Sequence, residues 1–220
     1  MANESKYSEE PRNRAAFTRS HDQLYTRFAN LYDTAVKTLP VWKAWLGGAI
    51  PHIQGPRVLE VSFGTGYLLT RYAAHFETYG IDYNRKMVQT ARKNLKRAGV
   101  SACLRQGNVE SLPYEDESFD SVVNTMSFSG YPDGAKAMGE MHRVLKEGGR
   151  LILIDVNYPS DGSWLGTVLV NLWKLTGDII RDMGALFDQF GLDYTDQEIG
   201  GYGSVHIYVA TKGNQPRFAS

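Results

Sequence analysis

The chain has 220 residues, with 24 Lys plus Arg and 24 Asp plus Glu, so it carries no formal net charge at pH 7. This length suits one globular domain, and we expect a single domain over residues 1–220. Without a basic excess to hold a phosphate backbone, nucleic acid is not an expected partner. The lone Cys103 cannot form an internal disulfide, and the polar N-terminus lacks the apolar core of a signal peptide, from which we expect a cytoplasmic protein.

The first predicted elements are helices. Residues 1–15 are polar and charged, and we expect them to be flexible. Residues 16–52 carry apolar and aromatic side chains at three- and four-residue intervals, which indicates two helices with a break near Pro40. The core is expected over residues 57–211, and residues 213–220 are expected to form a loose tail.

Within the core, predicted strands alternate with predicted helices. The strands are expected at residues 58–61, 78–81, 102–106, 119–124, 150–155 and 205–211, and the helices at residues 67–76, 85–97, 134–145 and 164–187. This alternation requires right-handed crossovers. It predicts an α/β fold, a Rossmann-like open twisted sheet, mainly parallel and of about seven strands, with helices on both faces, preceded by the N-terminal helices.

A glycine-containing turn follows the first core strand. Gly64 and Gly66 permit positive φ, which would let main-chain N–H groups approach a bound molecule closely. The helix expected from Tyr67 directs its positive end at the same place. The turn by itself suits a nucleotide phosphate, a nicotinamide dinucleotide or an amino-acid-bearing nucleoside.

Polar residues stand at the ends of four predicted strands, where an open parallel sheet binds its ligands. They are Glu60, Asp82, Asn108 and Asn124. The Asp82 carboxylate can accept two hydrogen bonds from a ribose diol. The alternative role is the N-cap of the next helix, for which Asn84 is equally placed. Asn108 can pair with an adenine edge beside the apolar Val109, or it can simply be a turn residue.

Taken in order, these segments resemble the class I S-adenosylmethionine-dependent methyltransferases over about residues 58–211. Residues 58–68, 80–87, 106–113 with 118–123, and 140–151 are similar to successive segments of that family. The most similar group methylates ubiquinone and menaquinone precursors, phospholipids and other small molecules. The resemblance implies S-adenosyl-L-methionine as cofactor, S-adenosyl-L-homocysteine as product, and in-line methyl transfer to a small acceptor.

The resemblance also implies roles for individual residues. The methionine part of the cofactor would be surrounded by Glu60, Ser62, Gly64 and Gly66, the ribose bound by Asp82, the adenine by Tyr83, Met87, Asn108 and Val109, and the amino group by the backbone carbonyl of Asn124. The resemblance further implies that the N-terminal helices are lid helices. Tyr25 and Tyr32 in them resemble lid aromatics, with core packing as the alternative.

Two departures from the family pattern accompany these roles. Ser62-Phe63 stands where the family usually has glycine and a small residue, and Asn108 stands where it usually has aspartate. A serine at positive φ would be strained and could reshape the pocket.

No catalytic residue and no metal site are assigned, because a sulfonium methyl group is already activated and transfer requires alignment and desolvation. A general base would matter only for an acceptor that holds its proton. His21, His142 and His206 are the candidates, each better explained as structural or surface.

We expect a lipophilic or aromatic acceptor between the N-terminal helices and residues 157–187, with Met126, Phe128 and Tyr131 adding to its surface. Apolar residues at helical spacing over residues 164–179 could line this pocket, touch a membrane surface or pack onto the sheet. The longest apolar stretch, residues 164–180, is interrupted by polar residues and is too short to span a bilayer. The oligomeric state is left open.

Two other functions remain open. An NAD(P)-dependent oxidoreductase would need glycine or alanine at Leu69 to complete its dinucleotide fingerprint. A non-catalytic S-adenosylmethionine sensor or scaffold would bind the cofactor without transferring its methyl group.

Overall fold

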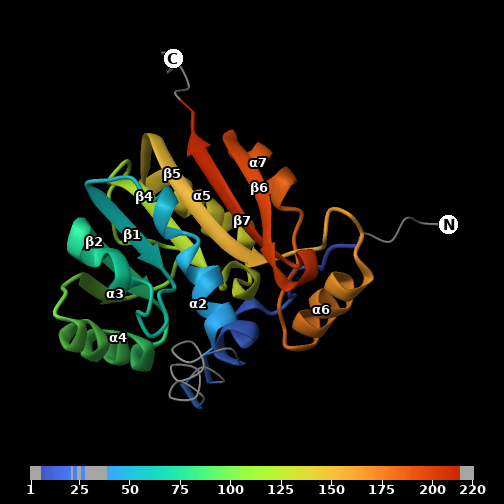
Figure 1. The fold of residues 1–220 in the computed structure, drawn as a ribbon, viewed down its shortest axis with the longest axis horizontal. Helices are drawn as coiled ribbons and strands as arrows, with labels where there is room; N and C mark the ends of the chain where they lie inside the picture. The colour runs from blue at the N-terminus through green and yellow to red at the C-terminus, as the bar shows by residue number, and fades with distance from the viewer. Residues whose placement is uncertain (1–5, 21, 24–25, 28–38, 214–220) are drawn as a thin grey trace.

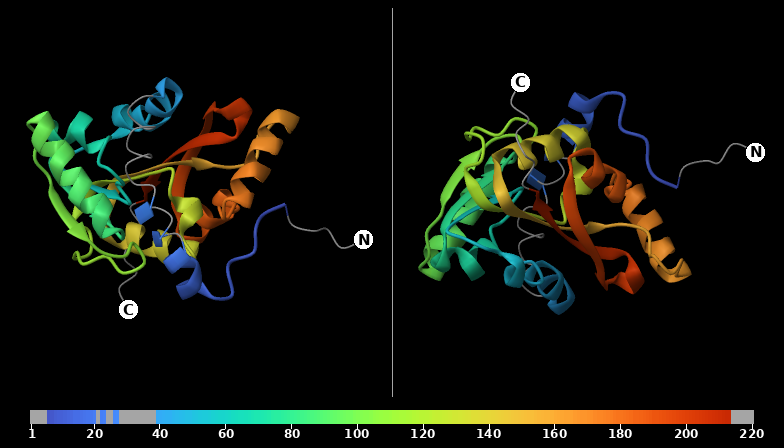
Figure 2. Two further views of the ribbon diagram at one scale, coloured as in Figure 1. Left: turned by 90° about the horizontal axis from the view of Figure 1, so that it is seen from below. Right: turned by 90° about the horizontal axis from the view of Figure 1, so that it is seen from above.

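The computed structural model describes residues 6–20, 22, 23, 26, 27 and 39–213. Its core has three layers, a twisted sheet between two layers of helices (Figures 1 and 2). Residues 14–20 are helical and precede the core. Tyr25, Tyr32 and the predicted tail from residue 214 lie outside the described residues.

The sheet has seven strands in the order β3-β2-β1-β4-β5-β7-β6. Their bounds are β1 Arg57–Val61, β2 Glu77–Asp82, β3 Cys103–Gln106, β4 Phe119–Thr125, β5 Leu145–Val156, β6 Leu192–Gly200 and β7 Val205–Lys212. The pairs among β1 to β5 are parallel, and β7 runs antiparallel to both β5 and β6. The expected open, mainly parallel sheet is confirmed.

The helical elements are α2 Pro40–Gly47, η1 Ile50–His52, α3 Leu69–Tyr72, η2 Ala73–His75, α4 Arg85–Ala98, η3 Phe128–Gly130, α5 Gly134–Val144, α6 Trp164–Leu175, α7 Met183–Gln189 and η4 Gly201–Gly203. The helix expected over residues 164–187 is wrong in extent, since it is two helices. The break includes Gly177 at φ 102°, and Asp182 caps α7 by accepting a hydrogen bond from the Ala185 N–H.

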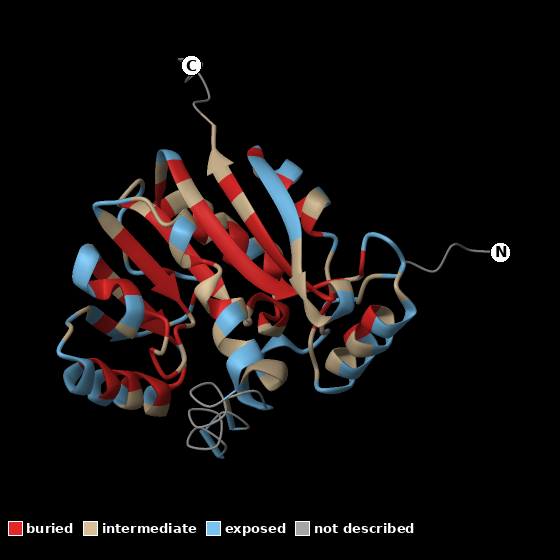
Figure 3. Ribbon diagram, viewed as in Figure 1, coloured by how far each residue is buried: buried red, intermediate tan, exposed pale blue. Residues whose placement is uncertain are grey.

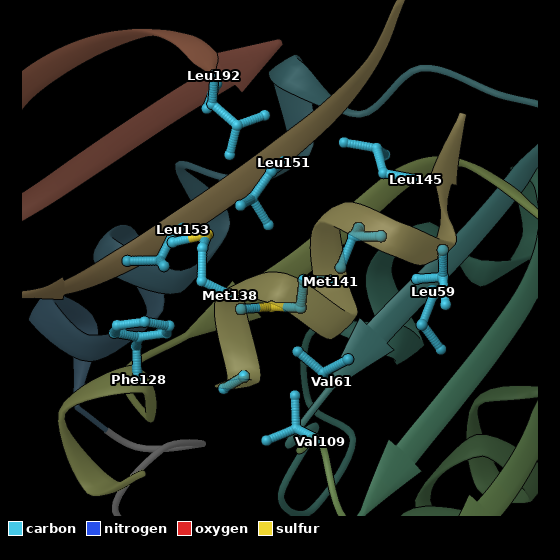
Figure 4. Packing of buried hydrophobic residues seen from close by; sticks show 14 of the residues in the cluster. Leu59, Val61, Val109, Phe128, Met138, Met141, Leu145, Leu151, Leu153 and Leu192 are labelled. Carbon is cyan, nitrogen blue, oxygen red and sulfur yellow. The ribbon is translucent and has the colours of Figure 1, made fainter. Parts of the chain in front are cut away.

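The core lies on both faces of the sheet, because successive side chains of a strand point to opposite sides. Leu59 and Val61 of β1 pack on one face with Met138 and Met141 of α5 (Figure 4). On the other face Val58 packs with residues of α3 and α4. The central strands are accordingly buried along most of their length (Figure 3).

The apolar stripe of α6 is not packed onto the sheet. Only Gly166 and Val170 of this helix are buried. Its exposed apolar residues are Trp164, Leu165, Val168, Leu172 and Leu175, with Leu175 83% exposed. Of the three roles considered for this stripe, packing onto the sheet therefore does not account for its outer face. Among the described residues, no helix is both long and apolar enough to span a membrane.

Candidate active site

A cavity lies at the carboxyl edge of the sheet, where β1 and β4 are neighbours and the strand order reverses. Its empty volume is about 940 Å³, part of it open to solvent, which is the size of a small-molecule site. Seven of the residues predicted for the site line this cavity: Ser62, Gly64, Asp82, Tyr83, Met87, Asn108 and Val109. Glu60, Gly66 and Asn124 are not in the lining.

The turn after β1 passes through the left-handed region three times. Ser62, Gly64 and Gly66 have φ of 54°, 56° and 73°. Ser62 thus adopts the positive φ that a serine occupies only at a cost. The Gly64 N–H donates to Asp82 at 2.8 Å and the Gly66 N–H to the Phe63 carbonyl at 2.9 Å. Both glycine N–H groups are therefore occupied within the protein.

Gly66 serves packing. A Cβ built on Gly66 would lie 2.8 Å from Ala91 Cβ, so the missing side chain lets the turn approach α4. The turn after β1 therefore packs directly against α4 at Ala91.

Asp82 is the last residue of β2 and is only 7% exposed. Its two oxygens accept hydrogen bonds from the Gly64 and Asn84 N–H groups, each at 2.8 Å. Burial is the main reason that the pKa of Asp82 rises to about 7. The N-cap of α4 is Asn84, whose Oδ1 accepts from the Met87 N–H at 3.0 Å. The helix cap is thus accounted for without Asp82, and each Asp82 oxygen keeps a further lone pair for a ligand.

Glu60, in β1, is buried and is not among the residues that line the cavity. It is 1% exposed and accepts a hydrogen bond from the Tyr72 hydroxyl at 2.9 Å. Burial raises the pKa of Glu60 to about 8, an effect that exceeds the opposing effect of the Tyr72 hydrogen bond. The charge of nearby Asp82 also raises the pKa of Glu60, so Glu60 lies close to the site without lining the cavity.

The wall expected to hold adenine combines buried and exposed residues. Met87 and Val109 are buried, whereas Tyr83 is 46% exposed. Asn108 closes a turn, since its side chain accepts from the Glu110 N–H at 3.0 Å and its carbonyl accepts from the Ser111 N–H at 3.1 Å. This side-chain contact leaves the Asn108 amide nitrogen available to the cavity.

The loop after β4 connects to the turn after β1 through side chains. Asn124 is fully buried, and its Nδ2 donates to the Tyr131 hydroxyl at 2.7 Å and to Ser127 Oγ at 2.9 Å. Tyr131 in turn donates to Ser62 Oγ at 2.7 Å. Met126, also in this loop, has φ 52° and lines the cavity with Tyr131, whereas the expected Phe128 is buried outside the lining.

The N-terminal segment also reaches the cavity, through two residues that no sequence pattern singled out. Thr18 and Asp22 are in the lining. Asn84 Nδ2 lies 2.8 Å from Asp22 Oδ1 and 2.6 Å from Thr26 Oγ1. The described part of the N-terminal helical region thus lies along one side of the cavity, and its role as a lid stays a prediction.

Histidine does not line the cavity in the described part of the chain. Desolvation lowers the pKa of His142, which contacts Phe190. His206 is buried and lies 2.7 Å from Asp196. His21 is outside the described residues. Over those same described ranges, no cluster of three or more His, Cys, Asp or Glu could hold a metal ion.

Comparison with known proteins gives concordant matches. The model of a family described as "Methyltransferase domain" matches residues 59–153. A demethylmenaquinone methyltransferase of Thermotoga maritima is 30% identical over 154 residues, 66% of either chain. A phosphatidylethanolamine N-methyltransferase of Cereibacter sphaeroides is 35% identical over 104 residues, 46% of this chain and 51% of that one. The matches span about half to two thirds of these curated relatives.

Solved structures agree with the fold. The YcgJ protein of Bacillus subtilis superposes with a TM-score of 0.62 at 29% identity and covers 69% of each chain. An S-adenosylmethionine-dependent methyltransferase of Thermotoga maritima, titled a possible histamine N-methyltransferase, superposes with a TM-score of 0.69. It covers 86% of this chain and 99% of its own, and at 21% identity it supports the fold alone.

Proposed function

The chain belongs to the class I S-adenosylmethionine-dependent methyltransferases, and from this premise we propose that it transfers a methyl group to a small lipophilic or aromatic acceptor. The observation that carries the proposal is the cavity at the strand-order reversal, whose wall combines the Ser62–Gly64 turn with the buried Asp82 carboxylate.

The residues of this cavity fit the cofactor. Asp82 retains acceptor positions for a ribose diol, and Met87 with Val109 supplies apolar surface for a base. Ser62 and Gly64 would face the methionine part. The bound cofactor supplies an activated methyl group, so the protein's own part is to align the reactants and exclude water. The buried lining and the N-terminal segment over it support both tasks.

The charge of the lining favours an acceptor without phosphate. Three carboxyl groups border the cavity, those of Asp22, Asp82 and Glu110, and no Lys or Arg is present among the described lining residues. A phosphate group would be repelled there. Met126, Tyr131 and Pro132 add apolar surface. Of the two acceptor types named by the curated relatives, an uncharged quinone-type ring fits this lining better than a phospholipid headgroup.

The test is methyl transfer itself. The protein is incubated with labelled S-adenosylmethionine and a short-chain naphthohydroquinone, phosphatidylethanolamine or a polar amine. We expect label on the hydroquinone. Transfer to the polar amine alone would refute the acceptor class. Cofactor binding without transfer to these compounds or to a native metabolite extract would favour the sensor function.

We also propose that the exposed face of α6 contacts a lipid surface, from which a lipophilic acceptor would arrive. Val170 and Trp173 on the inner side of α6 pack in one cluster with Met126, which lines the cavity. The outer face of α6 exposes five apolar residues to solvent. Leu172→Glu should reduce co-sedimentation with lipid vesicles, whereas Thr195→Glu on the exposed strand β6 should not. Equal binding by both variants would exclude this face.

A further inference from the structure

Ser62 keeps a side chain where the backbone favours glycine. Its φ is 54°, in the left-handed region that is unfavourable for a residue with a side chain. The Ser62 N–H donates to the Ile81 carbonyl at 2.7 Å, which holds the strained residue in place. Because the residue lines the cavity, its hydroxyl group is available to a ligand. Strain maintained at a ligand site points to a use for the side chain.

The hydrogen bonds around Ser62 run from Asn124 through the Tyr131 hydroxyl to Ser62 Oγ. Asn124 Nδ2 can only donate, so the Tyr131 oxygen accepts from it at 2.7 Å. Tyr131 then uses its single hydrogen to donate to Ser62 Oγ at 2.7 Å. The hydroxyl hydrogen of Ser62 is left without an acceptor among the described residues. The chain of donors from Asn124 through Tyr131 therefore ends in a free O–H at the cavity.

The amino-acid end of the cofactor carries a carboxylate that needs donors. Three carboxyl groups and no described Lys or Arg line the cavity. The N–H groups of Gly64 and Gly66 are already bonded within the protein. The neutral Ser62 hydroxyl can donate a hydrogen bond to this carboxylate without adding charge to the cavity.

We propose that the Ser62 hydroxyl donates a hydrogen bond to the carboxylate of the cofactor's amino-acid end, and that Tyr131 is the positioning residue that orients it. The proposal rests on the proposed function, since it requires that the cavity bind S-adenosylmethionine. This proposal explains why Ser62 stands where the family usually has glycine, since the serine hydroxyl would bind the cofactor.

The first test compares two ligands by calorimetry. S-adenosylhomocysteine has the amino-acid end, whereas 5′-methylthioadenosine lacks it. Ser62→Gly should weaken S-adenosylhomocysteine binding about tenfold and leave 5′-methylthioadenosine binding unchanged. Glycine adopts this positive φ without steric cost, so thermal unfolding of the ligand-free variant should show no loss of stability. Unchanged affinity for S-adenosylhomocysteine, or equal weakening for both ligands, would overturn the proposal.

The second test is a double-mutant cycle for Tyr131. Tyr131→Phe removes the hydroxyl that orients Ser62, and we expect about threefold weaker S-adenosylhomocysteine binding in the wild-type background. In the Ser62→Gly background the same change should have no further effect. An equal loss in both backgrounds would show that Tyr131 acts independently of Ser62. A folded wild-type protein that binds neither ligand would remove the proposed function, and this inference with it.

Discussion

The contact between Gly66 and Ala91 makes a quantitative prediction for Gly66→Ala. The substitution places an L-residue at φ 73°, which costs about 1–2 kcal/mol. It also places a Cβ 2.8 Å from Ala91 Cβ and 3.3 Å from Ala91 Cα. These atoms belong to α4 and cannot swing aside, and such overpacking costs about 1–3 kcal/mol. Because the two costs add, we expect the free energy of unfolding to fall by about 2–5 kcal/mol.

Gly99 provides a matched control. Its φ is 70°, and a Cβ there would meet nothing within 4 Å. Gly99→Ala therefore isolates the backbone cost of about 1–2 kcal/mol. Urea unfolding of both variants, with unchanged m-values, measures the difference. Gly66→Ala should lose at least about 1 kcal/mol more than Gly99→Ala. Equal losses would refute the packing role assigned to Gly66.

Three further predictions concern buried groups. Asp82→Ala should weaken S-adenosylhomocysteine binding by about 1.5–3 kcal/mol in calorimetry, and unchanged affinity in a folded variant would remove Asp82 from the site. The pKa of Glu60 is about 8 in the native state against an ordinary 4.5, so the native protein holds a proton that the unfolded chain releases, and wild-type stability should fall as pH rises across this window. Glu60→Gln should not show this fall in the free energy of unfolding, which is at most about 5 kcal/mol in the wild type. Parallel pH profiles of urea unfolding for the two proteins would contradict the prediction. Arg181 donates to the carbonyls of Phe128 and Tyr131, so Arg181→Met should cost about 2 kcal/mol or more in urea unfolding, and a loss below about 0.5 kcal/mol would show these bonds to be dispensable.

The sequence predicted the strands whose two faces are both buried. The apolar runs of β1, β4 and β5 are typical of strands that are buried on both faces of a mainly parallel sheet. Strand β6 was not predicted because most of its side chains are exposed or half-buried polar groups that form no apolar run. Its edge position alone does not explain this, since β3, the strand at the opposite edge, was predicted at residues 102–106. The break between α6 and α7 was also missed, since the apolar spacing continues across Ile179 and Ile180.

Site residues could be predicted where they lie at the carboxyl ends of the strands, because an open parallel sheet binds its ligands there. Asp82 and Ser62 fall there, and both line the cavity. Glu60 was grouped with them although it lies within β1, where the alternation of side chains turns it toward Tyr72. The link from Tyr131 to Ser62 joins residues 69 positions apart. Such pairs are set by tertiary packing, and no local pattern indicates them.

The central claim is that the cavity receives S-adenosylmethionine and not a nicotinamide dinucleotide. Calorimetric titration of the wild-type protein with S-adenosylhomocysteine and, separately, with NAD⁺ tests it most directly. We predict saturable binding of one S-adenosylhomocysteine per chain and none of NAD⁺. Binding of NAD⁺ with no binding of S-adenosylhomocysteine would contradict the account.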